Sequence, residues 1–205
     1  EAARFLRSAE SFGLEVDMTV VAPKENWVSN AAMKPKIIAD ARRRIPGPLL
    51  YVDVDAVFHA DPWPYLSQFD GDIAANVLND GELTGGTIFL ADTSAARCAV
   101  DEWVRRQREN PQTWDQKVLQ NMVEEEEASP NPKFCFQRLP HNLCHIFDRH
   151  YPHSYGPIFI EHLQASRSSA AKWGDKAEKR ERSRIVRLEQ IEKAYRSGGY
   201  STGPE

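Results

Sequence analysis

The sequence is poor in cysteine and lacks a long apolar run. Its 205 residues include three cysteines, and none of them forms a Cys-x-x-Cys pair. A disulfide framework and a zinc site are therefore not indicated, and reduced, buried thiols fit a cytoplasmic protein. No segment approaches the roughly 20 apolar residues that a membrane-spanning helix requires, and we see no hydrophobic signal region or internal repeat.

Charge is unevenly distributed along the chain. Residues 1–163 hold 16 Lys/Arg and 24 Asp/Glu, whereas residues 164–205 hold 10 and 6, so the net charge changes from −8 to +4. With 41% hydrophobic residues the chain can bury one full-sized core. We therefore expect one domain over residues 1–167 and a basic helical tail over residues 168–205 that lies outside the catalytic core.

The tail contains a helical pattern over residues 176–196. Its apolar side chains fall on one stripe, which consists of Ile185, Leu188, Ile191 and Tyr195. Such a stripe is typical of a helix that packs on a domain or a partner. If the chain contacts nucleic acid at all, we expect this basic tail to make the contact.

Helical and strand-like segments alternate along the rest of the chain, which indicates an α/β fold with a mixed, mainly parallel sheet flanked by helices. Helical periodicity, Pro and Gly positions and polar caps predict helices over 2–13, 34–44, 93–110 and 114–127. Apolar runs and alternation predict strands over 15–23, 47–55, 72–77, 86–92, 134–139 and 157–162.

The stretch "LLYVDVDAVF", residues 49–58, places two carboxylates, Asp53 and Asp55, after an apolar strand. Buried unpaired acids cost several kcal/mol each, roughly, so a positive partner is needed. In a strand both side chains project on the same side, at the carboxyl end where α/β sheets bind ligands. Two such carboxylates suit Mg²⁺ or Mn²⁺, particularly when a substrate diphosphate supplies further oxygens. The alternative is ordinary turn chemistry.

These residues resemble a known family. The segment "KPKIIADARRRIPGPLLYVDVDAVFHADP" looks like the part of GT-A-fold, nucleotide-sugar-dependent glycosyltransferases in which a Lys-Pro helix precedes the Asp-x-Asp strand. The likeness continues in order and covers most of residues 1–167, through "LTGGTIFLADT", "WDQKVLQ" and "PIFIEHLQASR". It implies transfer of a sugar from a nucleotide diphosphate sugar to an unidentified acceptor.

The resemblance also implies a cation site. Asp55 would bind the cation directly, Asp53 would bind the cation, the donor ribose or both, and His162 would be the third ligand. Because neutral imidazole suits Mn²⁺ better than Mg²⁺, we expect Mn²⁺. Lys34, expected at a helix N-terminus that favours anions, would help to hold the diphosphate.

The remaining candidates surround the sugar. The resemblance places Asp115 and Gln116 beside the donor sugar, for sugar binding or acid/base work, and lets the backbone at Gly85 and Gly86 approach it closely. A simpler explanation is a capping box formed by Thr113 and Gln116. If the reaction inverts the anomeric centre it needs a base, for which Asp115, Asp80 and Glu82 are candidates.

One part of the family pattern is missing. The chain begins in what should be the helix after the first strand, so we expect the nucleotide-base site to be incomplete. Two other functions stay open at this point. Asp-x-Asp also ends the nucleophile strand of haloacid-dehalogenase-type phosphatases, and a GT-A-like domain without its first strand could be a non-catalytic binding module.

Overall fold

The computed structural model describes residues 1–149, 156–165 and 177–197, which form two compact units. Unit 1 comprises Glu1–Val16, Asp53–Pro64 and His141–Glu205, and unit 2 comprises Asp17–Val52 and Tyr65–Pro140. The expected domain boundary after residue 167 lies outside the described residues. The helix expected in the tail is present as α8 (Ala177–Arg196), and packing groups it with unit 1.

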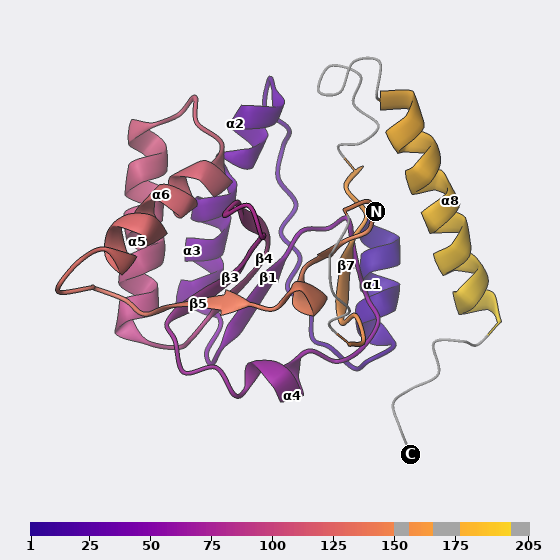
Figure 1. The fold of residues 1–205 in the computed structure, drawn as a ribbon, viewed down its shortest axis with the longest axis horizontal. Coiled ribbons are helices and arrows are strands. Elements are labelled where there is room, and N and C mark those ends of the chain that lie inside the picture. Colours follow the sequence, from indigo (N-terminus) through magenta and orange to yellow (C-terminus); the bar gives the residue numbers. More distant parts are fainter. Residues whose placement is uncertain (150–155, 166–176, 198–205) are drawn as a thin grey trace. The chain divides into compact units, whose positions relative to one another are not determined.

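Unit 2 contains a four-stranded sheet in the order β1-β4-β3-β5 (Figure 1). Its strands are β1 (Leu49–Val52), β3 (Ile73–Val77), β4 (Leu83–Leu90) and β5 (Phe136–Leu139). Its helices are α2 (Trp27–Ala31), α3 (Lys34–Arg44), α5 (Ser94–Glu109) and α6 (Asp115–Glu127), and α4 (Trp63–Leu66) spans the boundary between the units. The buried core includes Ile38 of α3, Trp103 of α5 and Met122 of α6, all packed against apolar sheet residues.

The mixed sheet is confirmed, but parallel pairing does not predominate within the described strands. In unit 2 only β3 and β5 pair in parallel, whereas β4 is antiparallel to both β1 and β3. The reason is a tight hairpin between β3 and β4, in which the Leu78 N–H donates to the Glu82 carbonyl at 2.9 Å. Gly81 turns this hairpin with a φ of +86°, a value that glycine adopts without strain.

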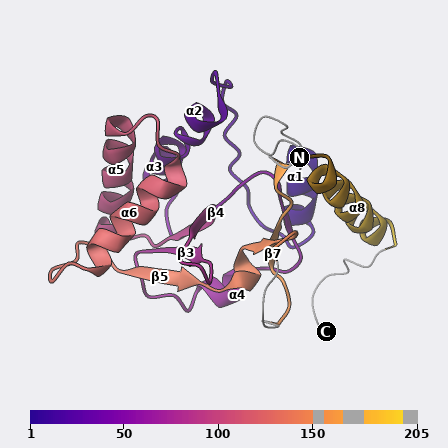
Figure 2. The same cartoon turned by 45° about the horizontal axis from the view of Figure 1, so that its top comes forward.

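Unit 1 contains a small three-stranded sheet in the order β2-β7-β6, flanked by α1 (Ala2–Glu10) and α8 (Figure 2). The strands are β2 (Ala56–Phe58), β6 (His145–Ile146) and β7 (Ile160–His162), and a 3-10 turn, η1 (His141–Leu143), precedes β6. β7 is antiparallel to β2 and parallel to β6. Val57, Leu163 and Ile191 form a small buried core between this sheet and α8.

The prediction of a strand over residues 15–23 is wrong. This segment has no regular secondary structure, and Val20 is 89% exposed. Its alternating pattern favours a strand, but a strand is stable only where a neighbour takes its backbone hydrogen bonds. No strand among the described residues pairs with it.

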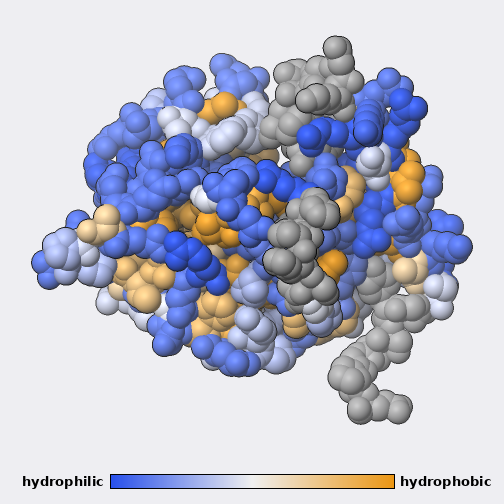
Figure 3. Space-filling model, viewed as in Figure 1, coloured by the Kyte–Doolittle hydropathy of each residue, from blue (hydrophilic) through white to orange (hydrophobic). Residues whose placement is uncertain are grey.

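The surface shown in Figure 3 is mainly hydrophilic, with smaller hydrophobic areas between the polar residues. None of the helices that the structure describes is both long and apolar enough to cross a bilayer. The other predicted helices are present with ends shifted by a few residues. The strand expected over 47–55 is shorter, because β1 ends at Val52, before the two carboxylates.

Candidate active site

Lys34, the first residue of α3, contacts two groups from other parts of unit 2. Its Nζ lies 3.2 Å from Asp115 Oδ2 and donates to the Gly85 carbonyl at 2.9 Å. The side chains of Lys34 and Asp115 are only 14% and 5% exposed, so each charge depends on the other. Three residues predicted from separate motifs therefore lie together.

Gly85 lies where β4 interrupts its pairing with β3. The two strands pair through Thr84 and again at Ile88, so residues 85–87 have no partner on β3. Side chains satisfy the backbone of Gly85 instead: its N–H donates to Gln116 Oε1 at 3.2 Å, and its carbonyl accepts the Lys34 hydrogen bond. Irregularities of this kind commonly lie beside active sites, because they change the direction of the strand.

The absence of a side chain at Gly85 leaves a small space. A Cβ built at this position would lie 3.5 Å from Lys34 Nζ, 3.6 Å from Asp115 Oδ2 and 3.6 Å from Gln116 Cβ. These are ordinary van der Waals distances, so a methyl group would fit here without displacing its neighbours. Gly86, the other predicted glycine, follows in the same stretch, which has no partner on β3.

The capping-box explanation for Gln116 is wrong. Helix α6 begins one residue later than such a box requires, with Trp114 at the N-cap position and no side-chain cap hydrogen bond. Thr113 therefore precedes the cap. The Gln116 side chain instead joins the site, because its Nε2 donates to Glu82 Oε1 at 3.0 Å while its Oε1 accepts from Gly85.

In unit 1 the structure brings Asp55 and His162 together. His162, the last residue of β7, is buried, and its Nδ1 lies 3.7 Å from Asp55 Oδ1. The other oxygen of that carboxylate accepts the Ala165 N–H at 2.8 Å. Gln164, just before Ala165, has a φ of +51°, a left-handed conformation that is uncommon outside glycine and recurs at functional sites.

Asp53 and Asp55 lie in a turn, which corrects their expected place on one side of a strand. The Asp53 carbonyl accepts the Ala56 N–H at 3.0 Å, so the chain turns between β1 and β2. Asp53 opens the turn and Asp55 is its third residue. The backbone of Asp55 is fixed as well, because its carbonyl accepts the Leu163 N–H at 3.0 Å.

The surroundings of His162 favour positive charge. Burial lowers the pKa of this imidazole, but the neighbouring Cys144 and the Asp55 carboxylate outweigh burial, so its pKa is raised above the ordinary value. A cation would have to replace the imidazole proton, after which a carboxylate oxygen and a neutral imidazole nitrogen this close can share it, given metal–ligand bonds of about 2.1 Å. Carboxylate oxygen and imidazole nitrogen are both ligand types that Mn²⁺ accepts, so the two side chains are chemically suited to the expected metal.

Residues 46–176 match the family model described as nucleotide-diphospho-sugar transferase. The chain belongs to this family. It is a glycosyltransferase, and the family implies a nucleotide-sugar donor for the transferase. The phosphatase and the non-catalytic module are thereby set aside.

One solved structure shows the same GT-A-type fold. The transferase resembles a glycosyltransferase involved in the glycosylation of the major capsid of PBCV-1, with 14% identity and a TM-score of 0.53 over 80% of this chain and 81% of that one. It also resembles galactosyltransferase LgtC in complex with donor and acceptor sugar analogs, with 16% identity and a TM-score of 0.43 over 86% and 69% of the two chains. No curated protein matches the sequence.

Sequence reasoning missed the importance of Glu161 in the transferase. This buried residue of β7 accepts from Arg187 Nε and Nη2, each at 2.7 Å, and lies 2.8 Å from His59 Nε2. Burial raises the pKa of Glu161, yet the hydrogen bonds from His59 and Arg187 lower it to about 2. A carboxylate inside an apolar strand was the available signal, since such a group requires partners. His59 is one of these partners.

Proposed function

We propose that the transferase moves a sugar from a nucleotide diphosphate sugar with the help of a divalent cation, Mn²⁺ in preference to Mg²⁺. The ligands are Asp53, Asp55 and His162. The observation that carries this proposal is the 3.7 Å approach of Asp55 Oδ1 to His162 Nδ1 from distant parts of the sequence. Among the described residues, Asp53, Asp55 and His162 are not grouped closely enough to hold a metal by themselves. We propose that the donor diphosphate supplies the further oxygen ligands that the cation needs.

Asp53, Asp55 and His162 would hold a cation that would neutralise the negative charge developing on the departing diphosphate. The protein's contribution is to hold the ligands in place. The Ala165 N–H fixes one oxygen of Asp55 and leaves the other facing His162. Asp53 is the first residue of the same turn, and it binds the cation, the donor ribose or both.

We propose that the space beside Gly85 receives the donor sugar. Asp115 and Gln116 border this space and offer oxygen acceptors and an amide to sugar hydroxyls, and Lys34 supplies positive charge for the diphosphate. Asp115 is paired with Lys34, which favours a role in sugar binding over that of a general base. Glu82 Oε1 accepts the Gln116 amide, so this candidate base is also engaged in the site.

A donor panel tests this function. Wild-type protein is assayed with different nucleotide diphosphate sugars, with and without Mn²⁺, and release of the nucleoside diphosphate is measured. We expect Asp55→Asn to lose Mn²⁺-dependent release at least 100-fold while keeping its fold, because the amide oxygen still accepts from Ala165 but the charge is gone.

The matched control is Asp61→Asn. Asp61 Oδ1 accepts the Trp63 N–H at 2.9 Å in a turn of the same unit, and an asparagine oxygen can do the same. This variant should retain wild-type release. Mn²⁺-stimulated release that survives in Asp55→Asn would exclude the proposed cation site.

A further inference from the structure

Helix α8 holds the two residues that flank His162. Arg184 Nε donates to the Leu163 carbonyl at 2.9 Å, and Arg187 grips the Glu161 carboxylate with two hydrogen bonds of 2.7 Å. The two arginines are three positions apart, so they share one face of the helix. One face of α8 therefore fixes the chain immediately before and after His162.

The alternation of β7 explains how this grip acts on His162 without touching its ring. Successive side chains of a strand point to opposite faces, so Glu161 and Leu163 share one face and His162 takes the other. The shared face is the one covered by α8, where Leu163 packs with Ile191. Because Glu161 and Leu163 are both fully buried, the strand cannot rotate without breaking this packing.

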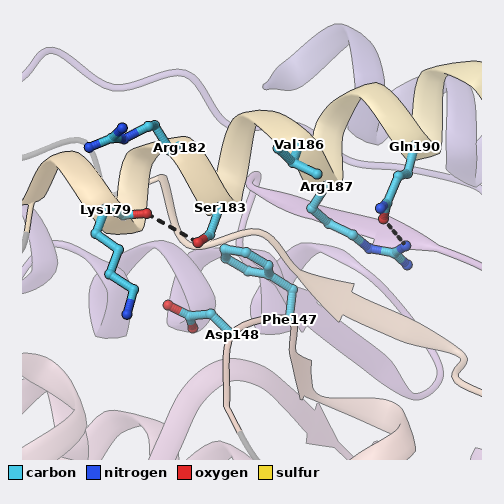
Figure 4. A pocket seen from close by; sticks show the side chains of 8 residues that line it. All are labelled: Phe147, Asp148, Lys179, Arg182, Ser183, Val186, Arg187 and Gln190. Carbon is cyan, nitrogen blue, oxygen red and sulfur yellow. Dashed lines mark hydrogen bonds between the residues drawn. The ribbon is translucent and has the colours of Figure 1, made fainter.

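The helix also contacts the segment that follows β6, the other strand paired with β7. Phe147 and Asp148 follow β6 and line a groove along α8 (Figure 4). Phe147 packs against the small core, and its N–H donates to the His162 carbonyl at 3.3 Å. Arg180 Nη1 of α8 lies 3.4 Å from Asp148 Oδ2. The backbone of His162 is therefore held both by α8 and by the segment that follows β6.

We propose that α8 is the element that positions His162 for its ligand role, and that Arg184 and Arg187 are positioning residues. The consequence for cation binding rests on the function proposed above. Groups that orient a metal ligand without touching the metal typically change metal affinity about 10–100-fold when they are removed. Helix α8 is then part of the working site rather than an accessory to it.

The test compares Arg187→Ala with Arg182→Ala in the full chain. Arg182→Ala removes the same charge from the same helix. The ion pair of Arg182 with Glu178 is highly exposed, and Figure 4 shows the Arg182 side chain directed away from Phe147 and Asp148. Two quantities are measured besides thermal stability: the NMR signals of the ¹⁵N-labelled His162 imidazole, and the affinity for Mn²⁺ alone by electron paramagnetic resonance.

We expect Arg187→Ala to shift or broaden the His162 signals and to weaken Mn²⁺ binding about 10–100-fold, with Arg182→Ala like wild type. Arg187→Lys should lie in between, because lysine keeps the charge but loses the planar fork. A purely structural role would lower stability and leave the His162 signals of the folded protein unchanged, and that result would overturn the proposal.

A second variant covers the case in which Arg187→Ala does not fold because Glu161 is left without its main partner. Arg187→Met combined with Glu161→Gln removes both charges, and we expect the same change at His162. If His162 responds as expected but even the wild type does not bind Mn²⁺, the positioning role stands and the cation site fails. The two proposals are thus separated.

Discussion

The two clusters of predicted site residues differ in how a carboxylate obtains its positive partner. In unit 2 the buried Asp115 is paired with a cation of the protein itself, Lys34. In unit 1 Asp55 faces an imidazole, and one of its oxygens is directed toward the position proposed for a metal ion. The first cluster is closed by its own charges, whereas for the second we propose that a cation from outside supplies the positive charge. The first should therefore affect mainly stability and the second mainly binding.

The largest expected effect follows from breaking the closed cluster. Lys34→Met leaves Asp115 buried without its cation and should destabilise the protein by about 3 kcal/mol. Adding Asp115→Leu should recover most of that loss, because both charges are then absent, while donor turnover stays lost. Urea unfolding measures both values.

Lys36→Met is the matched control for this pair of variants. Lys36 lies on the same helix and forms an ion pair with Asp40, but the two side chains are 64% and 48% exposed, so the loss of stability should be much smaller than for Lys34→Met. If the double variant were as unstable as the two single losses added together, the pair would not be coupled and the closed-cluster description would be wrong.

An intermediate effect is expected from Gly85→Ala, which sharpens the distinction between stability and binding. The new methyl group meets its neighbours at ordinary contact distances, so stability should change by less than about 1 kcal/mol. It occupies the proposed sugar space, so donor turnover should fall at least tenfold. Steady-state kinetics with the best donor of the panel measure this.

Gly81→Ala provides the opposite pattern in the neighbouring hairpin. Its φ of +86° strains any other residue, whereas nothing lies within 4 Å of an added Cβ. We expect a loss of about 1 kcal/mol in stability and an unchanged KM for the donor. Equal donor kinetics in the two glycine variants would exclude the proposal that the donor sugar binds in the space beside Gly85.

The smallest effect concerns a carboxylate outside both clusters. Hydrogen bonds from Arg105 and Arg106 outweigh burial and lower the pKa of Glu102 to about 2. Since its folded pKa is depressed, its stabilisation is present above pH 4.5 and is lost as the pH falls toward 2. Glu102 is a partly exposed surface group, so Glu102→Gln should cost less than about 1 kcal/mol at pH 7 and nothing near pH 2. Chemical unfolding at both pH values tests whether burial, rather than charge alone, distinguishes it from Asp115.

Local sequence patterns predicted the helices well and the edges of the sheet poorly. Helix α3 agrees with its prediction because periodicity and a proline near its first position are properties of the segment itself. The strand expected over 15–23 failed because a strand also needs a partner, which alternation does not reveal. The turn at Asp53 is a similar case, since β1 stops where a new sheet begins.

The candidate site residues could be named from the sequence only where the family resemblance pointed to them. Taken alone, Lys34 reads as a solvated lysine and Asp115 as first-turn charge of a helix, and the resemblance selected both. The contacts of Glu161 were beyond either kind of reasoning, because no local pattern distinguishes Arg187 from the other basic residues of α8. Such long-range pairs are set by tertiary packing.

The side-chain hydrogen bonds to Gly85 constrain how this transferase can evolve. Gln116 and Lys34 satisfy the backbone of β4 at the same time as they border the proposed sugar space. A substitution that changes sugar preference at either position therefore also loosens the strand, and directed evolution through them carries a cost in stability. Libraries aimed at new donors should keep both residues fixed and vary Glu82, whose carboxylate contacts the Gln116 side chain rather than the backbone of Gly85.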